Sequence, residues 1–101
     1  MMLIEAICTI KDAIDRSSAE ADDGPWLSAI GKAGLVAQGN TRQGAIDEAY
    51  TAHFGDIELR FRHYWRDTSR TFSPGPDRTT MTLTVLSQNK AIDSYSKSYD
   101  T

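Results

Sequence analysis

The chain has 101 residues and a formal net charge of −3, so it is long enough for one domain and too short for a second hydrophobic core. This acidic balance is not typical of a protein that binds nucleic acid over its whole surface, because contacts with phosphates dominate such binding. Cys8 is the single cysteine, which excludes an internal disulfide. We therefore expect a reducing compartment, the cytoplasm, or the host cytoplasm if the protein is phage-encoded.

The first sixteen residues predict an amphipathic helix. Leu3, Ile7, Ile10 and Ile14 recur at the three- and four-residue steps of one helix face. The isoleucines leave a strand over residues 2–11 as the alternative. A glutamate interrupts the apolar start and no basic region precedes it, so we expect neither a signal peptide nor a transmembrane span.

The stretch 26–38 predicts a short hairpin. Gly31 and Gly34 suit a turn between its two halves, and each would destabilise a helix interior by about 1 kcal/mol relative to alanine. A short helix is the alternative, because Pro25 suits a first helical turn and Gly39 suits the position after a helix end.

Residues 41–54 predict a central helix. Asn40 or Thr41 is suited to cap its start, and Gly55 is suited to follow its end. Helical spacing then places one set of residues on a common face: Ala45, Ile46, Ala49, Tyr50 and His53.

Two alternating runs predict a long antiparallel hairpin. Apolar and polar residues alternate over 57–66 and again over 79–87, which is the period of a half-buried strand. The connection 67–78 is long enough to contact a partner, although a plain flexible loop is the simpler interpretation. The predicted fold is a small single α+β domain over residues 1–88, with N-terminal helix, short hairpin, central helix and long hairpin, followed by a flexible C-terminal tail over 89–101.

One segment resembles a known family. Three blocks follow one another: Gly24-Pro25-Trp26-Leu27-Ser28-Ala29-Ile30, then Gly34-Leu35-Val36-Ala37-Gln38-Gly39-Asn40-Thr41, then Ala45-Ile46-Asp47-Glu48-Ala49. Their order is similar to the core of HicB-type antitoxins, over residues 24–54 only. The resemblance implies a fold partly like a double-stranded-RNA-binding domain, and a protein that neutralises a toxin nuclease by covering it.

Residues that could carry catalysis or bind a metal are sparse. His53 and His63 are the only histidines, and neither has a second ligand at metal-binding spacing. His63 shares a strand face with Phe61 and Trp65, so we expect a packed, hydrogen-bonded core histidine, and we expect Cys8 to be a small buried hydrophobe. The sequence also lacks a glycine-rich phosphate loop. We therefore predict no enzyme activity, no catalytic residue, no cofactor and no metal site.

Two charged surfaces are candidates for binding a partner. Arginines and a tyrosine recur on the polar face of strand 57–66 at about 6–7 Å, which suits the carboxylates of an acidic protein or the phosphates of a nucleic acid. A plain solvated face is the alternative. The acidic N-terminal stretch could instead imitate a phosphate backbone. The predicted partner-binding residues are Arg60, Arg62, Tyr64, Arg66, Arg70, Asp12, Asp15, Asp22 and Asp23.

The predicted function is the non-enzymatic binding of a macromolecular partner that the protein inhibits or regulates. Antitoxins and phage anti-defence proteins, including anti-CRISPR inhibitors, are similar in being short, mildly acidic and free of catalytic motifs. The expected partner is a protein or ribonucleoprotein, with nuclease complexes among the candidates, and not a membrane; a homodimer is left open. The alternative is a nucleic-acid-binding accessory protein that uses the arginine-rich strand.

Overall fold

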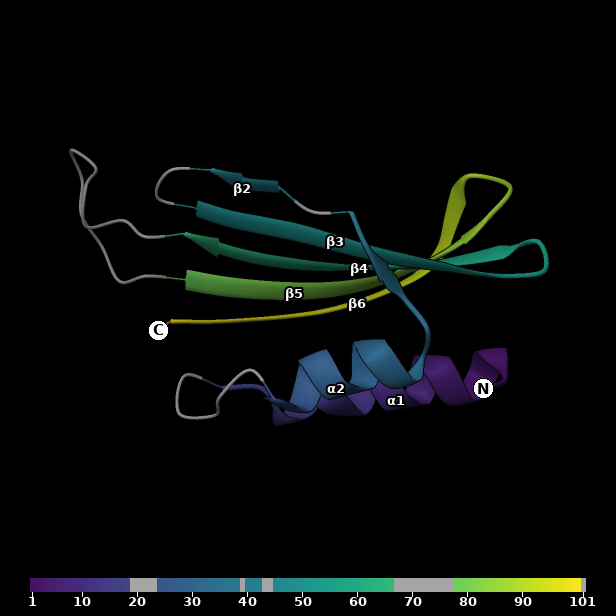
Figure 1. Cartoon of the computed structure of the whole chain (residues 1–101), viewed down its shortest axis with the longest axis horizontal. Coiled ribbons are helices and arrows are strands. Elements are labelled where there is room, and N and C mark those ends of the chain that lie inside the picture. The colour runs from purple at the N-terminus through teal and green to yellow at the C-terminus, as the bar shows by residue number, and fades with distance from the viewer. Residues whose placement is uncertain (19–23, 39, 43–44, 67–77, 101) are drawn as a thin grey trace.

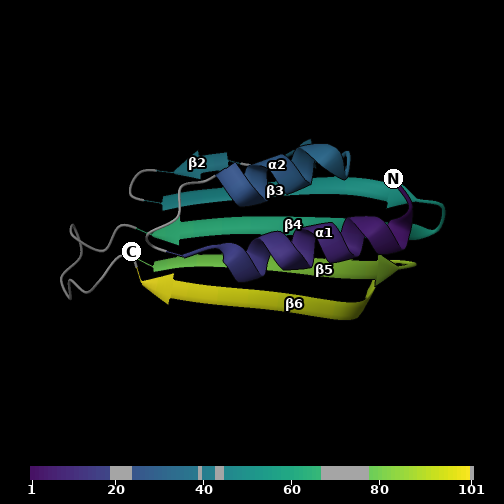
Figure 2. The ribbon, with the colours of Figure 1, turned by 90° about the horizontal axis from the view of Figure 1, so that it is seen from below.

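The chain folds into two layers, because two helices cover one face of an antiparallel sheet (Figure 1, Figure 2). This computed structural model describes residues 1–18, 24–38, 40–42, 45–66 and 78–100. The predicted α+β class, N-terminal helix and long hairpin are confirmed. The elements, in chain order, are α1 (Leu3–Arg16), α2 (Gly24–Lys32), β1 (Val36–Ala37), β2 (Asn40–Arg42), β3 (Ala45–Phe54), β4 (Ile57–Arg66), β5 (Arg78–Ser87) and β6 (Lys90–Asp100).

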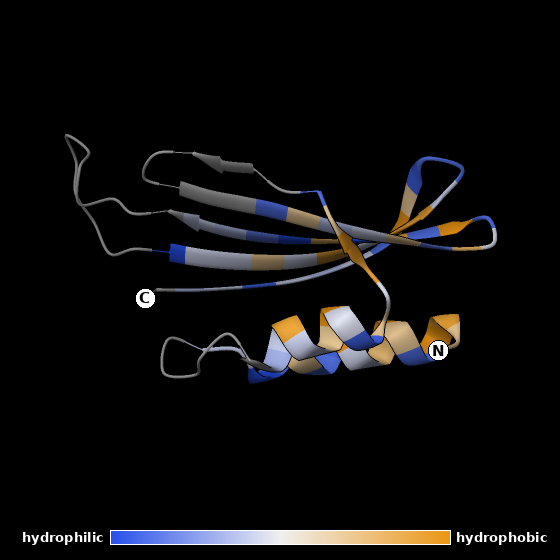
Figure 3. Ribbon diagram, viewed as in Figure 1, coloured by the Kyte–Doolittle hydropathy of each residue, from blue (hydrophilic) through white to orange (hydrophobic). Residues whose placement is uncertain are grey.

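Helix α1 forms where the spacing predicted it, and the strand alternative is wrong. Ala6, Ile10 and Ile14 are buried on the side that faces the sheet. Hydrophobic and hydrophilic bands alternate along both helices in Figure 3, as they do in amphipathic helices. Cys8 is exposed, contrary to expectation, because it lies two residues from both Ala6 and Ile10 and so on the opposite side of the helix.

Helix α2 replaces the hairpin predicted for 26–38, so the helical alternative is the correct one. Pro25 lies in its first turn, where a missing N–H has no cost. Gly34, with a φ of 77°, ends the helix. The N–H of Leu35 donates to the carbonyl of Ile30 at 3.1 Å and that of Gly34 to Gly31 at 3.2 Å, the two bonds of a glycine-dependent helix C-cap.

Strand β3 replaces the central helix predicted for 41–54, and that prediction is wrong. It pairs with β4 along its whole length, from Ala45 opposite Arg66 to Phe54 opposite Ile57. Gly55, with a φ of 64°, lies in the hairpin turn and does not end a helix. The long partner strand decides the outcome, because it satisfies the backbone of β3 and brings its alternate side chains against the helices.

Strand β6 occupies the segment predicted to be a flexible tail, and that prediction is also wrong. It pairs antiparallel with β5, from Lys90 opposite Ser87 to Asp100 opposite Arg78. The two-residue turn before it holds Gln88 and Asn89 at φ values of 52° and 66°, as tight hairpins require. The predicted hairpin of β4 and β5 is confirmed, and β3 to β6 form a continuous antiparallel meander.

Polar contacts fasten β6 to the end of α1. The ammonium of Lys97 donates to the carbonyl of Asp15 at 2.9 Å and to that of Ser17 at 2.8 Å. A cation is favourable there, because the last carbonyls of a helix carry partial negative charge. The hydroxyl of Tyr95 donates to the Asp15 carboxylate, and Lys11 forms an ion pair with Asp93 at 3.3 Å.

The hydrophobic core lies between the sheet and the helices. The largest fully buried side chains come from α1, β4 and β5: Ile10, Ile14, Leu59, Phe61, Met81 and Leu83. Trp26 of α2 stacks on Phe61, with ring centroids 5.6 Å apart. Because this burial uses only one face of the sheet, alternate side chains of β4, β5 and β6 lie on the opposite face.

Candidate binding face of the sheet

The face of the sheet that lacks helices carries a row of long cationic and aromatic side chains beside two rows of hydroxyls. In the strand register, Arg60 lies opposite Thr84, Arg62 opposite Thr82, and Tyr64 opposite Thr80. These threonines in turn lie opposite serines of β6. We call this set the outer face: Arg60, Arg62 and Tyr64 of β4, Thr80, Thr82 and Thr84 of β5, and Ser94, Ser96 and Ser98 of β6.

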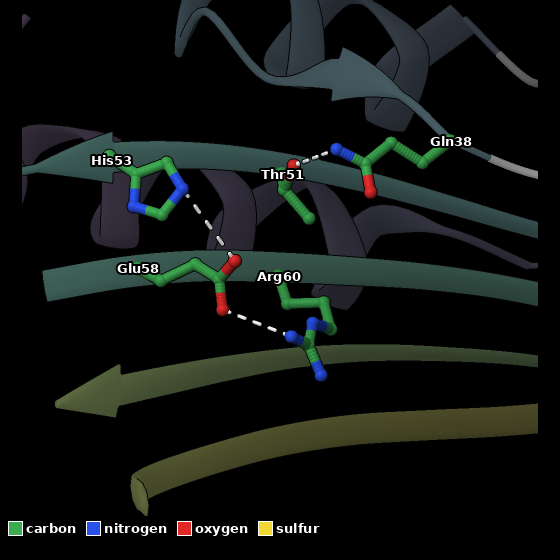
Figure 4. Close-up of polar contacts among 5 residues, drawn as sticks. All are labelled: Gln38, Thr51, His53, Glu58 and Arg60. Carbon is green, nitrogen blue, oxygen red and sulfur yellow. Dashed lines mark hydrogen bonds and ion pairs between the residues drawn. The ribbon is translucent and has the colours of Figure 1, made fainter. Parts of the chain in front are cut away.

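One end of the outer face contains a shared carboxylate. Figure 4 shows Glu58 between His53 and Arg60, with the guanidinium of Arg60 at 3.0 Å and the imidazole of His53 at 3.8 Å. The Arg60 side chain is 51% exposed, so this pair is solvated and contributes at most about 1 kcal/mol. Arg60 can therefore exchange Glu58 for an acidic group of a partner at small cost.

The middle of the outer face has a shallow depression of about 300 Å³, lined by Arg62, Tyr64, Thr80 and Thr82. It forms because the long side chains of β4 stand beside the short side chains of β5. The guanidinium of Arg62 lies 5.4 Å from the centroid of the Tyr64 ring, a cation–π contact. The hydroxyls of Thr80 and Ser98 are 2.9 Å apart and form a hydrogen bond across β5 and β6.

Near β1, two side chains of this face form a hydrogen bond with each other. Gln38 donates from its amide nitrogen to the Thr51 hydroxyl at 2.8 Å, and Figure 4 shows this contact on the same side of the sheet as Arg60. Thr51 is 8% exposed, so it contributes little accessible surface. Thr51 is therefore covered, whereas His53 of the same strand stays accessible on this face, with its side chain 72% exposed.

The predicted partner-binding residues divide between the two layers. Arg60, Arg62 and Tyr64 lie together on the outer face, and Arg66 follows them at the end of β4, where the structure describes its backbone. Asp12 and Asp15 lie on α1, which covers the opposite face. Three further predicted residues and the long connection lie outside the described residues: Arg70, Asp22, Asp23 and the segment 67–77.

The two aspartates of α1 both have partners within the molecule. Asp12 pairs with Arg16 one helical turn later at 3.0 Å, and Asp15 accepts the bond from Tyr95. A second depression, of about 310 Å³, lies between the helices and is lined by Thr9, Arg16, Pro25, Ser28, Ala29 and Lys32. The helix layer thus places both signs of charge close together, whereas the row on β4 is mainly cationic.

The hydroxyl rows were missed by the sequence analysis as a binding surface. The alternation over 79–87 predicts only a half-buried strand that includes Thr80, Thr82 and Thr84, and the tail predicted over 89–101 contains the serines of β6. A signal for β6 was present, because Ser94, Ser96 and Ser98 alternate with larger residues at the strand period of two.

His63 lies in the core, as the sequence predicts. His63 is 8% exposed, its Nδ1 atom lies 3.5 Å from a carboxylate oxygen of Glu48, and its ring centroid lies 4.6 Å from that of Trp26. The Tyr50 hydroxyl donates to the same Glu48 oxygen at 3.2 Å. Among the described residues, no group of three histidine, cysteine, aspartate or glutamate side chains is placed to hold a metal ion.

Burial raises the pKa of Tyr50 above the ordinary tyrosine value, and the neighbouring Glu48 carboxylate adds to the effect by repulsion and by its hydrogen bond. The raised pKa means that the folded protein holds this proton more tightly than the unfolded chain does. Stability from Tyr50 is therefore complete below about pH 10 and is lost as the pH rises through the folded-state pKa.

We expect the free energy of unfolding of the native protein to fall more steeply above pH 10 than that of Tyr50→Phe. Urea unfolding at a series of alkaline pH values measures the difference. Thr82→Ala, on the outer face, removes a hydroxyl that does not titrate in this range and is the control, which should follow the native curve. Parallel curves for the native protein and Tyr50→Phe would contradict the effect of Glu48 and burial on this hydroxyl.

Comparison with protein-family models, with curated proteins and with solved structures finds no match for this chain. The resemblance of 24–54 to HicB-type antitoxins stays a prediction, and the segment forms α2 and β3 where the sequence predicts a hairpin and a helix. No helix in the described residues is both long and apolar enough to cross a membrane.

Proposed function

We propose that this protein is a non-enzymatic binding protein that inhibits or regulates a macromolecular partner by covering it with the outer face. The observation that carries the proposal is the exposed pair Arg60 and Arg62 beside a depression bordered by threonine hydroxyls, on the side of the sheet without helices. The backbone of this face is held in place by strand pairing, so binding orders its side chains and not its main chain.

The chemistry of the outer face suits an acidic, acceptor-rich surface. Guanidinium groups donate to carboxylates in a fixed fork, and arginine and tyrosine are the residues that most often anchor protein contacts. The hydroxyls of β5 and β6 can donate or accept around these anchors. A protein or ribonucleoprotein with an exposed acidic patch fits this arrangement. A nuclease complex neutralised in the manner of antitoxins or anti-CRISPR inhibitors is one such partner.

The second candidate function is nucleic-acid binding as an accessory protein. Its support is the spacing of Arg60 and Arg62, about 6–7 Å along one side of a strand, which matches successive phosphates. The Tyr64 ring, with the Arg62 guanidinium in cation–π contact, also offers a platform for an unpaired base. Net charge opposes this candidate, because the chain is acidic as a whole.

Affinity capture from a lysate of the native host, with and without nuclease, tests both candidates. The native protein is compared with the double variant Arg60→Ala/Arg62→Ala, and with Arg16→Ala as a control of the same chemistry on the helix layer. We expect the double variant to bind the captured partner at least about tenfold more weakly, because interface arginines each contribute about 1 kcal/mol or more. The control should bind as the native protein does.

The results separate the candidates clearly. Capture that survives nuclease and depends on the two arginines supports a protein partner, whose activity should then fall as the protein is added. Capture that nuclease abolishes, with affinity that falls steeply as salt rises, favours nucleic acid. Loss of capture with Arg16→Ala but not with the double variant would place the binding surface on the helices and refute the outer face.

A further inference from the structure

A carboxylate lies beside the arginine row of the outer face. Glu58 points to the same side of β4 as Arg60 and Arg62, because residues two apart along a strand share a face. One oxygen of Glu58 accepts a hydrogen bond from the guanidinium of Arg60 at 3.0 Å, and the other lies 3.8 Å from the imidazole of His53 (Figure 4). The Glu58 side chain is only 20% exposed, less than either neighbour. The carboxylate is therefore held close to the guanidinium of Arg60.

The strand register explains why Glu58 turns toward Arg60. The residue opposite Glu58 on β5 is Leu86, whereas Arg60 lies opposite Thr84. Leu86 is 8% exposed and lies on the same side of the sheet as Glu58. An apolar neighbour offers the carboxylate no hydrogen bond and limits the access of water to one side of it. The attraction between Glu58 and Arg60 is stronger for this reason, because opposite charges attract more where water is scarce.

This ion pair affects the charge of the outer face more than the stability of the fold. An exposed pair contributes little to stability. Its carboxylate nevertheless offsets the charge of Arg60 for any ligand that approaches from solvent. Nucleic acids depend on that charge, because attraction between phosphates and cations supplies essentially all of their non-specific binding to proteins. The outer face therefore binds phosphates more weakly than its row of arginines indicates.

The pair leaves Arg60 able to contact a partner of fixed shape. The bond to Glu58 uses the Nη2 nitrogen, and a guanidinium has several further N–H donors. These donors suit an acceptor that approaches from the side away from Glu58. A folded protein can place a carboxylate there, and can add contacts with Tyr64 and with the hydroxyls of β5, which do not depend on net charge.

We propose that Glu58 determines the specificity of the outer face, because it disfavours nucleic acid and leaves the other contacts of a protein partner in place. This role rests on the function proposed above, and identifies nucleic acid as the ligand class that the outer face excludes. Specificity is a difference between two affinities, and proteins commonly increase it with a group that repels the wrong ligand. Glu58 is such a group, since it carries the same sign of charge as a phosphate and lies beside an arginine that a phosphate would otherwise contact.

Fluorescence anisotropy of a labelled single-stranded RNA oligonucleotide at low salt tests the role of Glu58. Glutamine keeps a side-chain oxygen for Arg60 but lacks the negative charge, so we expect Glu58→Gln to bind the RNA about fivefold more tightly than the native protein does. Glu5→Gln makes the same change in net charge at an exposed position of α1, on the helix layer. This control should bind the RNA as the native protein does.

A double variant tests whether the gain requires Arg60. Glu58→Gln/Arg60→Ala removes one charge of each sign, so it has the net charge of the native protein and should bind the RNA no more tightly. The proposal would be overturned by an unchanged affinity in Glu58→Gln, by an equal gain in Glu5→Gln, or by a gain that persists without Arg60. If nuclease-resistant capture of a partner still depends on Arg60 and Arg62, any of these results refutes only the role of Glu58 and leaves the proposed function supported.

Discussion

Phe61→Ala is expected to lower the free energy of unfolding by about 3–5 kcal/mol. Phe61 is fully buried in the middle of β4, where its ring stacks on Trp26 at 5.6 Å and lies 6.2 Å from the ring of Tyr50. Its removal leaves a cavity between the sheet and α2 that these neighbours cannot fill without moving. The loss is a large share of the 5–15 kcal/mol that typically stabilises a small domain.

Urea unfolding measures this loss, with tryptophan fluorescence and circular dichroism as two independent signals. Phe54→Ala is the matched control, because it removes the same ring from the end of β3, where the side chain is only partly buried. We expect the control to cost less than half as much as Phe61→Ala. Equal losses at the two positions would mean that the core is not centred on β4.

A chain that ends at Asn89 is expected to lose its cooperative unfolding transition. The removed strand contributes Tyr95 and Tyr99, which pack against the core, and the lysine that caps α1. Full burial of a large apolar side chain is worth about 1.5–3 kcal/mol, of which each partly buried tyrosine supplies a share, and a hydrogen bond from a charged group is worth about 1.5–3 kcal/mol. Together with the lost pairing along the whole of β5, these contributions are a large share of the stability of a small domain. A truncated chain that unfolds at the native urea midpoint would contradict the structural role of β6.

Two substitutions separate the capping lysine from the rest of β6. Lys97→Met removes the ammonium that binds the carbonyls of Asp15 and Ser17, and should cost about 1–3 kcal/mol of unfolding free energy. Lys90→Met removes the same charge from an exposed position of the same strand, and its effect should stay within about 0.5 kcal/mol. The difference between the two free energies of unfolding measures the anchoring of α1.

The spacing of apolar residues was sufficient to predict an element where only the helical period, or only the strand period, fits the sequence. In α1 the burial of Ile10 and Ile14 follows the helical step that the sequence shows. In β4 the alternation is complete enough to predict that Leu59 and Phe61 are buried while Arg60 and Arg62 face solvent. These elements required no knowledge of their neighbours, because their own side chains specify one buried side.

The sequence pattern predicted the wrong element where the helical period and the strand period fit the same residues. Between 45 and 54 a helix face and a strand face can each be drawn, and Tyr50 belongs to both. Residues 45–54 form a strand because they pair with β4 along their whole length. The backbone hydrogen bonds of this pairing outweigh the weak local preference of the residues for a helix. Gly34 led to the wrong prediction of a hairpin for a similar reason. It follows α2 and ends it with a positive φ, the same conformation that a hairpin turn would use.

The sequence by itself determined the α+β class, the first helix, the long hairpin and the arginine row on one side of β4. Only the tertiary structure decided which side of the sheet the helices cover, and that β6 extends the arginine row with a plane of hydroxyls. The reason is that a strand with few apolar residues carries only a weak burial signal, here the alternation of its serines with larger residues. Strand β6 is ordered by the backbone of β5 and by contacts with α1, and the contacted residue of α1 lies 80 or 82 positions earlier in the chain.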